Sequence, residues 1–256
     1  MSNFREQSKI RGEVRPIVVN VCNFPKGSRD LPSLLGFDEV RTLFHEFGHA
    51  LHGLLSQVTY ESLSGTNVKQ DFVELPSQIM EHWALETEVM KQYARHHETG
   101  EPIPDELIEK IHAAEKFNQG FATTEYLAAS FLDMAWHSPG SADITNVTAF
   151  EEQAMQNIDL IPEVAPRYRS TYFQHIFAGD NYSAGYYSYI WAEVLDADGY
   201  EAFKENGIFD AETARLFRKN ILENGGTVDP MELYRRFRGR EPEVAPLLVA
   251  RGLEDL

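Results

Sequence analysis

Two histidines and a glutamate lie close together in the motif HEFGH at residues 45–49. Apolar residues recur at helical spacing from Asp38 to Leu55, which predicts a helix around the motif. Histidines at positions i and i+4 lie on one helix face, about 6 Å apart along the axis at ~1.5 Å per residue. Their imidazoles could therefore bind one zinc ion, with Glu46 beside a water molecule as general base.

The alternative is a chance pattern on a surface helix, with His45 and His49 solvated. The residues around the motif are all uncharged: Leu43, Phe44, Phe47 and Gly48. Such surroundings indicate a buried site rather than a charged surface. Because buried polar side chains are costly without a partner, the context favours a zinc site.

A catalytic zinc site needs a third protein ligand besides His45 and His49. His52 shares their helix face, but it lies about 10.5 Å from His45 along the axis, too far for zinc bonds of ~2.1 Å. His52 is therefore expected to pack in the core or to orient a ligand. The residues after the motif also do not fit the metzincin pattern HExxHxxGxxH. Glu74, at the start of the next predicted helix, is the best candidate, and the alternative is that it only caps that helix.

Three polar residues surround Glu74 in the sequence: Asp71, Gln78 and Glu81. Hydrogen bonds from such neighbours commonly orient zinc-binding histidines. We expect these three residues to serve that purpose.

An aromatic segment follows His175 and reads IFAGDNYSAGYYSYIW. If it is helical, Tyr182, Tyr186 and Tyr189 form one stripe of hydroxyl groups. Stripes of this kind are usually packing surfaces. Two glycines in the segment suggest mobility, however, and hydrogen-bond donors on a loop that closes over substrate recur in catalysis.

The elements that must position these side chains are predicted to be mainly helical. Further helices are expected at residues 71–93, with a kink or later start at Pro76, at 104–136, with a break near 118–120, and at 147–158. Three capped helices follow, with starts at Asp210 and Asp229 and the last end at Gly252. A strand is predicted at 16–24, a short hairpin at 57–70 and a loop at 137–146.

Composition excludes several classes of protein. The 256 residues are 43% hydrophobic and 25% charged, which is typical of a globular protein with a sizeable core. The net charge of −17 repels phosphate backbones and anionic lipids, so we expect no nucleic-acid partner and no membrane partner. No apolar run approaches the ~20 residues of a membrane span, and residues 1–15 lack a signal-peptide core. The single cysteine, Cys22, excludes an intrachain disulfide and makes the cytoplasm the default expectation.

Longer runs around these motifs resemble one known family. VRPIVVNVCNF, SLLGFDEVRTLFHEFGHALHGL, SGTNVKQDFVELPSQIMEHWALE and HIFAGDNYSAGYYSYIWAEVLDADGY are similar to stretches of the thimet oligopeptidase family of zinc metallopeptidases. Within it, RYRSTYFQHIF and FLDMAWH most resemble the bacterial peptidyl-dipeptidases. The resemblance implies a mainly α fold: a gluzincin-type HExxH helical catalytic domain with a small antiparallel β element near the active site.

By this resemblance, one Zn²⁺ per chain is bound by His45, His49 and Glu74, and Glu46 is the general base. The family's substrate-contacting residues fall on the aromatic segment: His175, Tyr182, Tyr186 and Tyr189. Tyr189, with Tyr182 or His175, would donate hydrogen bonds to the developing oxyanion.

The resemblance also implies short unstructured peptides as substrates. Release of C-terminal dipeptides requires a cation near the site to bind a free carboxylate. Arg167 and Arg169 precede His175 and are the candidates for substrate binding. The alternative is that both are solvated or paired with some of the 40 acidic residues.

Members of this family are well over twice as long, so residues 1–256 are expected to be the C-terminal catalytic portion. Its expected partner is the N-terminal portion of the same protein, which would form the other wall of a deep channel. Three functions remain open: a peptidyl-dipeptidase, an endo-acting oligopeptidase of the thimet type, or a zinc-binding fragment with weak or no activity alone. An unrelated helical interaction protein with a fortuitous HExxH is a further, remote alternative.

Overall fold

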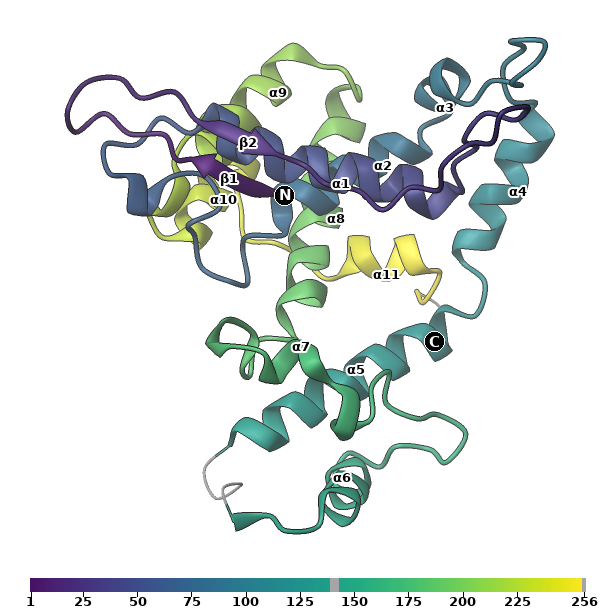
Figure 1. Cartoon of the computed structure of the whole chain (residues 1–256), viewed down its shortest axis with the longest axis vertical. Coiled ribbons are helices and arrows are strands. Elements are labelled where there is room, and N and C mark those ends of the chain that lie inside the picture. The colour runs from purple at the N-terminus through teal and green to yellow at the C-terminus, as the bar shows by residue number, and fades with distance from the viewer. Residues whose placement is uncertain (139–142, 255–256) are drawn as a thin grey trace.

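A computed structural model describes residues 1–138 and 143–254 (Figure 1). These residues form helices α1 to α11 and a two-stranded antiparallel sheet, which confirms the predicted mainly helical class. The elements are β1 (Ser2–Arg5), β2 (Ile17–Val19), α1 (Phe37–Leu55), α2 (Leu75–Leu85), α3 (Thr87–Tyr93), α4 (Asp105–Glu115), α5 (Gln119–His137), α6 (Val147–Gln156), α7 (Gln174–Phe177), α8 (Ser188–Asn206), α9 (Ala211–Phe217), α10 (Pro230–Arg238) and α11 (Ala245–Arg251). None of the described helices has the length and apolar character that a membrane crossing requires.

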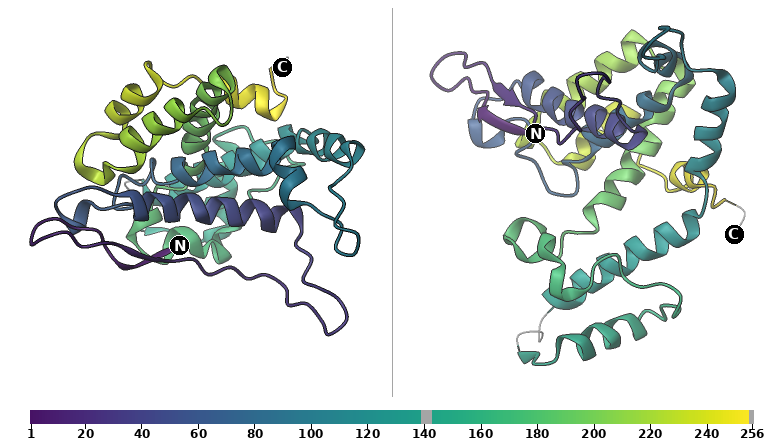
Figure 2. Two further views of the ribbon diagram at one scale, coloured as in Figure 1. Left: turned by 90° about the horizontal axis from the view of Figure 1, so that it is seen from above. Right: turned by 45° about the vertical axis from the view of Figure 1, so that its right-hand side comes forward.

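Helices α1 and α2 lie side by side (Figures 1 and 2); α1 carries the histidine motif, and α2 begins just after Glu74. The start of α1 is fixed locally, because the Glu39 carboxylate accepts the N–H of Gly36 at 2.6 Å. Strand β2 packs on the other side of α1. There Gly53 approaches Val18 so closely that a Cβ at residue 53 would lie 2.9 Å from the Val18 side chain.

The two larger apolar cores of the described residues lie along α8, which runs between them (Figure 1). The first core joins α2, α8 and α10 and includes the fully buried Leu75 and the buried Leu195. The second joins α5, α6 and α7 and includes the fully buried Leu132 and Ile176. Ile190, in the first turn of α8, packs against the second core. One helix therefore sets the position of the α1–α2 pair relative to the aromatic segment.

Several element boundaries agree with the sequence. The Asp210 side chain accepts the N–H of Thr213, and the Asp229 side chain accepts that of Met231, so both predicted N-caps are confirmed. Gly252 ends α11 with φ of 65°, a conformation that glycine adopts without strain. The break near residues 118–120 is also confirmed, because Asn118 has φ of 57° between α4 and α5.

Other boundaries differ. The predicted hairpin at 57–70 is wrong, because this stretch forms turns and a short 3₁₀ helix at Glu61–Leu63. Strand β2 is shorter than the predicted strand. It pairs with β1, a strand that the sequence did not indicate. The helix predicted at 71–93 has the later start that Pro76 suggested, at Leu75, but it is interrupted at Glu86, whose backbone is extended. The predicted loop at 137–146 lies partly outside the described residues.

His52 on α1 is fully buried, and neither ring nitrogen has a hydrogen-bond partner among the described residues. Burial, assisted by the nearby His49, lowers the pKa of His52 to about 3. The side chain is therefore neutral at neutral pH and packs as part of the core.

This burial makes the free energy of unfolding depend on pH. The unfolded chain protonates His52 below its ordinary pKa of 6.5, whereas the folded protein does so only at about pH 3. Between these values the unfolded state binds more protons, so the folded state loses about 1.4 kcal/mol per pH unit as pH falls. We expect the free energy of unfolding, measured with urea at several pH values and with metal chelated, to change with pH by this much more in wild type than in His52→Leu. The same pH dependence in both proteins would show that His52 is not held neutral.

Candidate metal centre and substrate cavity

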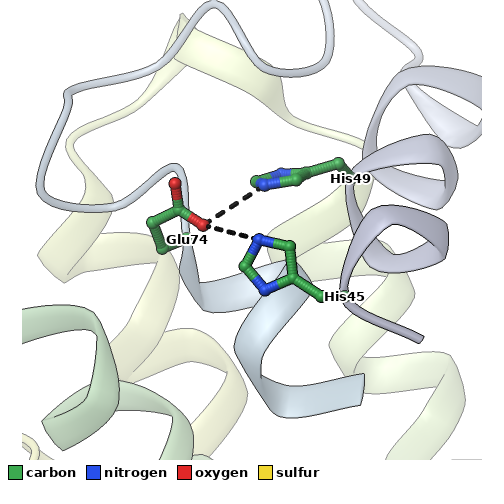
Figure 3. Close-up of side chains that lie close together, drawn as sticks. All are labelled: His45, His49 and Glu74. Carbon is green, nitrogen blue, oxygen red and sulfur yellow. Dashed lines mark ion pairs between the residues drawn. The ribbon is translucent and has the colours of Figure 1, made fainter. Parts of the chain in front are cut away.

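His45, His49 and Glu74 converge at the junction of α1 and α2 (Figure 3). Oε2 of Glu74 lies 3.3 Å from Nε2 of His45 and 3.2 Å from Nε2 of His49. One ligand atom from each residue lies within 4.8 Å of the other two. Two imidazole nitrogens and one carboxylate oxygen form a donor set typical of catalytic metal sites that keep an open position.

The backbone brings Glu74 to the histidines through a close helix contact. A Cβ at Gly48, inside the histidine motif, would lie 2.2 Å from the carbonyl oxygen of Pro76. Glu74 is the residue just before α2, and Ser77 donates a hydrogen bond of 2.9 Å to its Oε2. The alternative in which Glu74 only caps α2 is wrong: Glu74 occupies the N-cap position, but its side chain makes no capping hydrogen bond and turns toward α1.

The charges at this centre reinforce one another. Burial opposes ionisation of Glu74, but hydrogen bonds to His45 and His49 outweigh it and lower the pKa of Glu74. Burial likewise disfavours the charged form of His45, yet Glu74 and Glu81 raise its pKa to about 9. The anionic Glu74 therefore attracts a positive charge to the point where the imidazoles meet. A divalent cation fits this donor set.

Glu81, one of the predicted orienting residues, contacts a candidate ligand directly. The Nδ1–H of His45 donates to Oε1 of Glu81 at 2.7 Å, which directs Nε2 toward Glu74. Nη2 of Arg41 lies 2.9 Å from the second Glu81 oxygen, and Nη1 lies 3.4 Å from Glu115. Arg41 was missed by the sequence analysis, although its place one turn before His45 on the same helix face was a usable signal.

The structure does not bring the other two predicted orienting residues to the histidines. Asp71 accepts a hydrogen bond of 3.0 Å from the Tyr187 hydroxyl. Gln78 donates to the carbonyl oxygen of Tyr189 at 3.3 Å. Both residues therefore connect the start of α2 to the aromatic segment.

Glu46 follows His45 on α1 and lies beside the small sheet. Its carbonyl oxygen accepts a hydrogen bond of 3.0 Å from the side chain of Asn20, the residue that follows β2. The antiparallel β element thus lies next to the candidate general base, as predicted.

His175, Tyr182, Tyr186 and Tyr189 form one aromatic cluster. The His175 ring lies 4.3 Å from that of Tyr182, 5.5 Å from that of Tyr186 and 5.9 Å from that of Tyr189, measured between centroids. The predicted helical stripe is wrong, because Tyr182 lies in a 3₁₀ turn, Tyr186 in the following turn and Tyr189 in α8. The side chains meet because the chain folds back between α7 and α8.

Two hydroxyl groups of this cluster, those of Tyr186 and Tyr189, keep their protons, because burial raises the pKa of each. Burial, with further contributions from Tyr182 and from the charge of Glu74, raises the pKa of Tyr189 well above its ordinary value. Nε2 of His175 lies 3.1 Å from that hydroxyl, and burial lowers the pKa of His175. The hydrogen bond from Gln78 to the backbone of Tyr189 ties this cluster to α2, the helix that follows Glu74.

A cavity of about 620 Å³ lies between α2, α5, α8 and α11. Its wall includes Glu81 on the metal side and His175, Tyr186 and Tyr189 on the aromatic side. Arg167 also lines it, stacked over the ring of Tyr126 at 5.2 Å. The cavity therefore reaches from Glu81, the hydrogen-bond partner of His45, to three residues of the aromatic cluster.

Arg169, the predicted substrate-binding cation, does not line this cavity. Its Nε lies 2.6 Å from Oε1 of the buried Glu151. The same glutamate accepts hydrogen bonds from the backbone N–H and the hydroxyl of Ser170, at 2.7 and 2.8 Å. The alternative for Arg169 therefore holds: it pairs with an acidic residue, Glu151. Of the two arginines considered, Arg167 is the one on the cavity wall.

Comparison of the sequence with those of known proteins identifies the family of this chain. Residues 1–253 match Peptidase family M3. The chain is 47% identical to "Dipeptidyl carboxypeptidase" of Escherichia coli over 99% of its length, and 49% identical to the protein of the same name from Salmonella typhimurium, also over 99%. It is 41% identical to "Oligopeptidase A" of Salmonella typhimurium over 94% of its length. These matches cover 37%, 37% and 35% of the relatives, so the chain spans little more than a third of their length. The chain therefore belongs to peptidase family M3.

Proposed function

We propose that this chain is the zinc-binding catalytic part of a peptidase that releases dipeptides from the C-terminus of short peptides. The observation that carries the proposal is the convergence of His45, His49 and Glu74 within 4.8 Å, with Glu46 on the same helix as the two histidines. The family and the names of the relatives agree with it.

His45, His49 and Glu74 would hold the zinc ion, with Glu81 fixing the orientation of His45. When bound, zinc supplies Lewis-acid activation of water and of the peptide carbonyl. Glu46 takes the proton of the attacking water and later delivers it to the departing amine. Its place in HExxH, next to one ligand and on the helix that carries both, suits that role.

The aromatic cluster stabilises the charge that develops on the carbonyl oxygen. Tyr189 keeps its proton because its pKa is raised, so its hydroxyl is a donor. Tyr182 or His175 supplies the second hydrogen bond. Loss of one donor of this kind costs on the order of 3–4 kcal/mol of transition-state stabilisation.

Arg167 is the cation that we assign to the C-terminal carboxylate of the substrate. It lines the cavity, and its one carboxylate partner in the described structure is Glu125, at a long 3.4 Å from Nε. The guanidinium also hydrogen-bonds the Tyr186 side chain on the cavity wall, where it would make a bidentate contact with the substrate carboxylate. Internal cleavage, which needs no carboxylate anchor, is the alternative within the same family.

The remaining part of the enzyme is proposed to complete the channel. The relatives are far longer than this chain, and several large apolar side chains on α1 are about half exposed here: Leu43, Phe47 and Leu54. Alone, the chain would hold zinc and hydrolyse peptides poorly, and addition of the remaining part would restore turnover. High activity of the chain alone would contradict this part of the proposal.

Glu81→Gln should weaken zinc binding by about 10- to 100-fold, because the amide cannot hold His45 as the carboxylate does. Competition against a fluorescent chelator measures this loss. Glu115→Gln is the matched control, since Glu115 touches only Arg41 in this network, and its zinc affinity should stay close to that of wild type. Equal affinities for wild type and Glu81→Gln would remove Glu81 from the site.

Glu46→Gln should retain one equivalent of zinc but lower kcat by at least about 100-fold, because the amide cannot accept the water proton. Metal analysis and peptide hydrolysis by the full-length protein measure the two effects. His45→Ala and Glu74→Ala should lose zinc as well. Substantial turnover by Glu46→Gln would exclude it as general base, and zinc binding unaffected by the two alanine variants would support an unrelated function.

Arg167→Met should raise KM for peptides with a free C-terminus by roughly 10- to 100-fold, the effect of losing one charged hydrogen-bonding contact. KM for the amidated peptides should change little. Arg169→Met is the control and should leave the ratio between the two substrates unchanged. If wild type cleaves free and amidated peptides equally well, the carboxylate anchor is wrong and internal cleavage is favoured.

A further inference from the structure

The segment between α7 and α8, residues 178–187, carries two tyrosines of the aromatic cluster but little regular structure. Asp180–Tyr182 form a short 3₁₀ turn, and irregular turns follow. Ala184 has φ of 54°, a left-handed conformation that residues with a side chain rarely adopt. An external contact must therefore hold this conformation.

Asp133 on α5 supplies that contact. Its side chain is fully buried, at 0% exposure. Oδ1 accepts the N–H of Ala184 at 3.0 Å, and Oδ2 accepts the N–H of Tyr186 at 2.8 Å. Both carboxylate oxygens thus bind the backbone of the segment, one on the strained residue and one on a tyrosine of the cluster.

Two more contacts strengthen this arrangement. Nδ1 of His137, one turn later on α5, lies 2.7 Å from Oδ1 of Asp133 and helps to compensate its buried charge. The hydroxyl of Tyr126, two turns earlier, donates to the carbonyl oxygen of Tyr186. Both backbone polar groups of Tyr186 are therefore bound by α5, which fixes the direction of its side chain.

The consequence reaches the cavity wall. Tyr182 lies at the start of the same turn, where its carbonyl oxygen accepts the N–H of Gly185 at 2.9 Å. Its ring meets His175 at 4.3 Å and stacks parallel to that of Tyr189 at 6.0 Å. Moving the backbone at residues 184 and 186 would therefore displace Tyr182 and Tyr186 from His175 and Tyr189.

We propose that Asp133 is a positioning residue for substrate: it fixes residues 178–187 so that Tyr186 stands at the cavity with His175 and Tyr189, and Tyr182 packs against those two rings. This inference rests on the proposed peptidase function, because it assigns those tyrosines to the substrate. Asp133 itself does not touch the peptide and acts through the backbone of the segment.

Asp133→Asn tests the proposal, because it conserves size but replaces one acceptor with an amide that faces a backbone N–H. In the full-length enzyme, kcat/KM for a short peptide should fall roughly 10- to 100-fold, the effect of a small misplacement of binding groups. Zinc affinity should stay within about twofold of wild type, since His45, His49 and Glu74 lie on other elements. Amide hydrogen exchange in residues 178–187 should become faster, while exchange in α1 and α2 stays unchanged.

Two further variants separate positioning from a general loss of stability. Asp198→Asn is the matched control, because Asp198 is equally buried but binds Tyr234 and Arg240, away from the cavity. It should lower the unfolding temperature without changing kcat/KM below that temperature. In a Tyr182→Phe background, Asp133→Asn should cost much less than in wild type, since it acts through residues that include Tyr182.

These measurements also distinguish failure of the positioning role from failure of the proposed function. Unchanged hydrogen exchange in residues 178–187, or fully additive effects of Asp133→Asn and Tyr182→Phe, would overturn the positioning role whether or not the enzyme cleaves peptides. Faster exchange confined to that segment, in a full-length protein that hydrolyses no peptide, would support the contact between Asp133 and the segment and count against the substrate role assigned to it.

Discussion

The close contact between α1 and the start of α2 is the constraint on which the site depends. Gly48 has no side chain, so the carbonyl oxygen of Pro76 can lie where a Cβ would otherwise be. This approach places the Glu74 carboxylate about 3 Å from both imidazoles, although Glu74 belongs to a different element. A larger residue at position 48 would push α2 away and move the third ligand with it. The glycine in HEFGH is thus as necessary to the geometry as the two histidines.

Charge compensation extends outward from that contact. The buried Glu74 receives a hydrogen bond from Ser77, and Glu81 lies between His45 and Arg41. Because a buried carboxylate is costly unless it is paired or hydrogen-bonded, these partners keep Glu74 and Glu81 ionised and ordered. The same logic applies to Asp133 on α5. The metal centre and the aromatic cluster therefore each depend on a buried carboxylate that binds groups from another element.

Helix α8 connects the metal centre to the aromatic cluster. Its first turn carries Tyr189, and its middle contributes Leu195 to the core that supports α2. Hydrogen bonds from Gln78 to Tyr189 and from Tyr187 to Asp71 add direct contacts between the start of α2 and the aromatic segment. Since α8 belongs to both cores, a shift of the aromatic side relative to the metal side requires disruption of a core. Apolar packing along α8 thus holds the aromatic cluster at a fixed place relative to the metal centre.

The features that the sequence predicts are those that depend on residues close together in the chain. Helical periodicity around His45 and the caps at Asp210 and Asp229 depend on neighbours a few residues away, so the sequence predicts them well. The pairing of β1 with β2 and the contacts of Asp133 join distant segments, and no local pattern encodes them. The tyrosines show the difference most clearly: their spacing suggested one helix face, yet they meet through a turn that Asp133 holds in place. The remaining signal was Asp133 itself, an acidic residue in the otherwise apolar run FLDMAW, where a charge needs a partner from elsewhere in the chain.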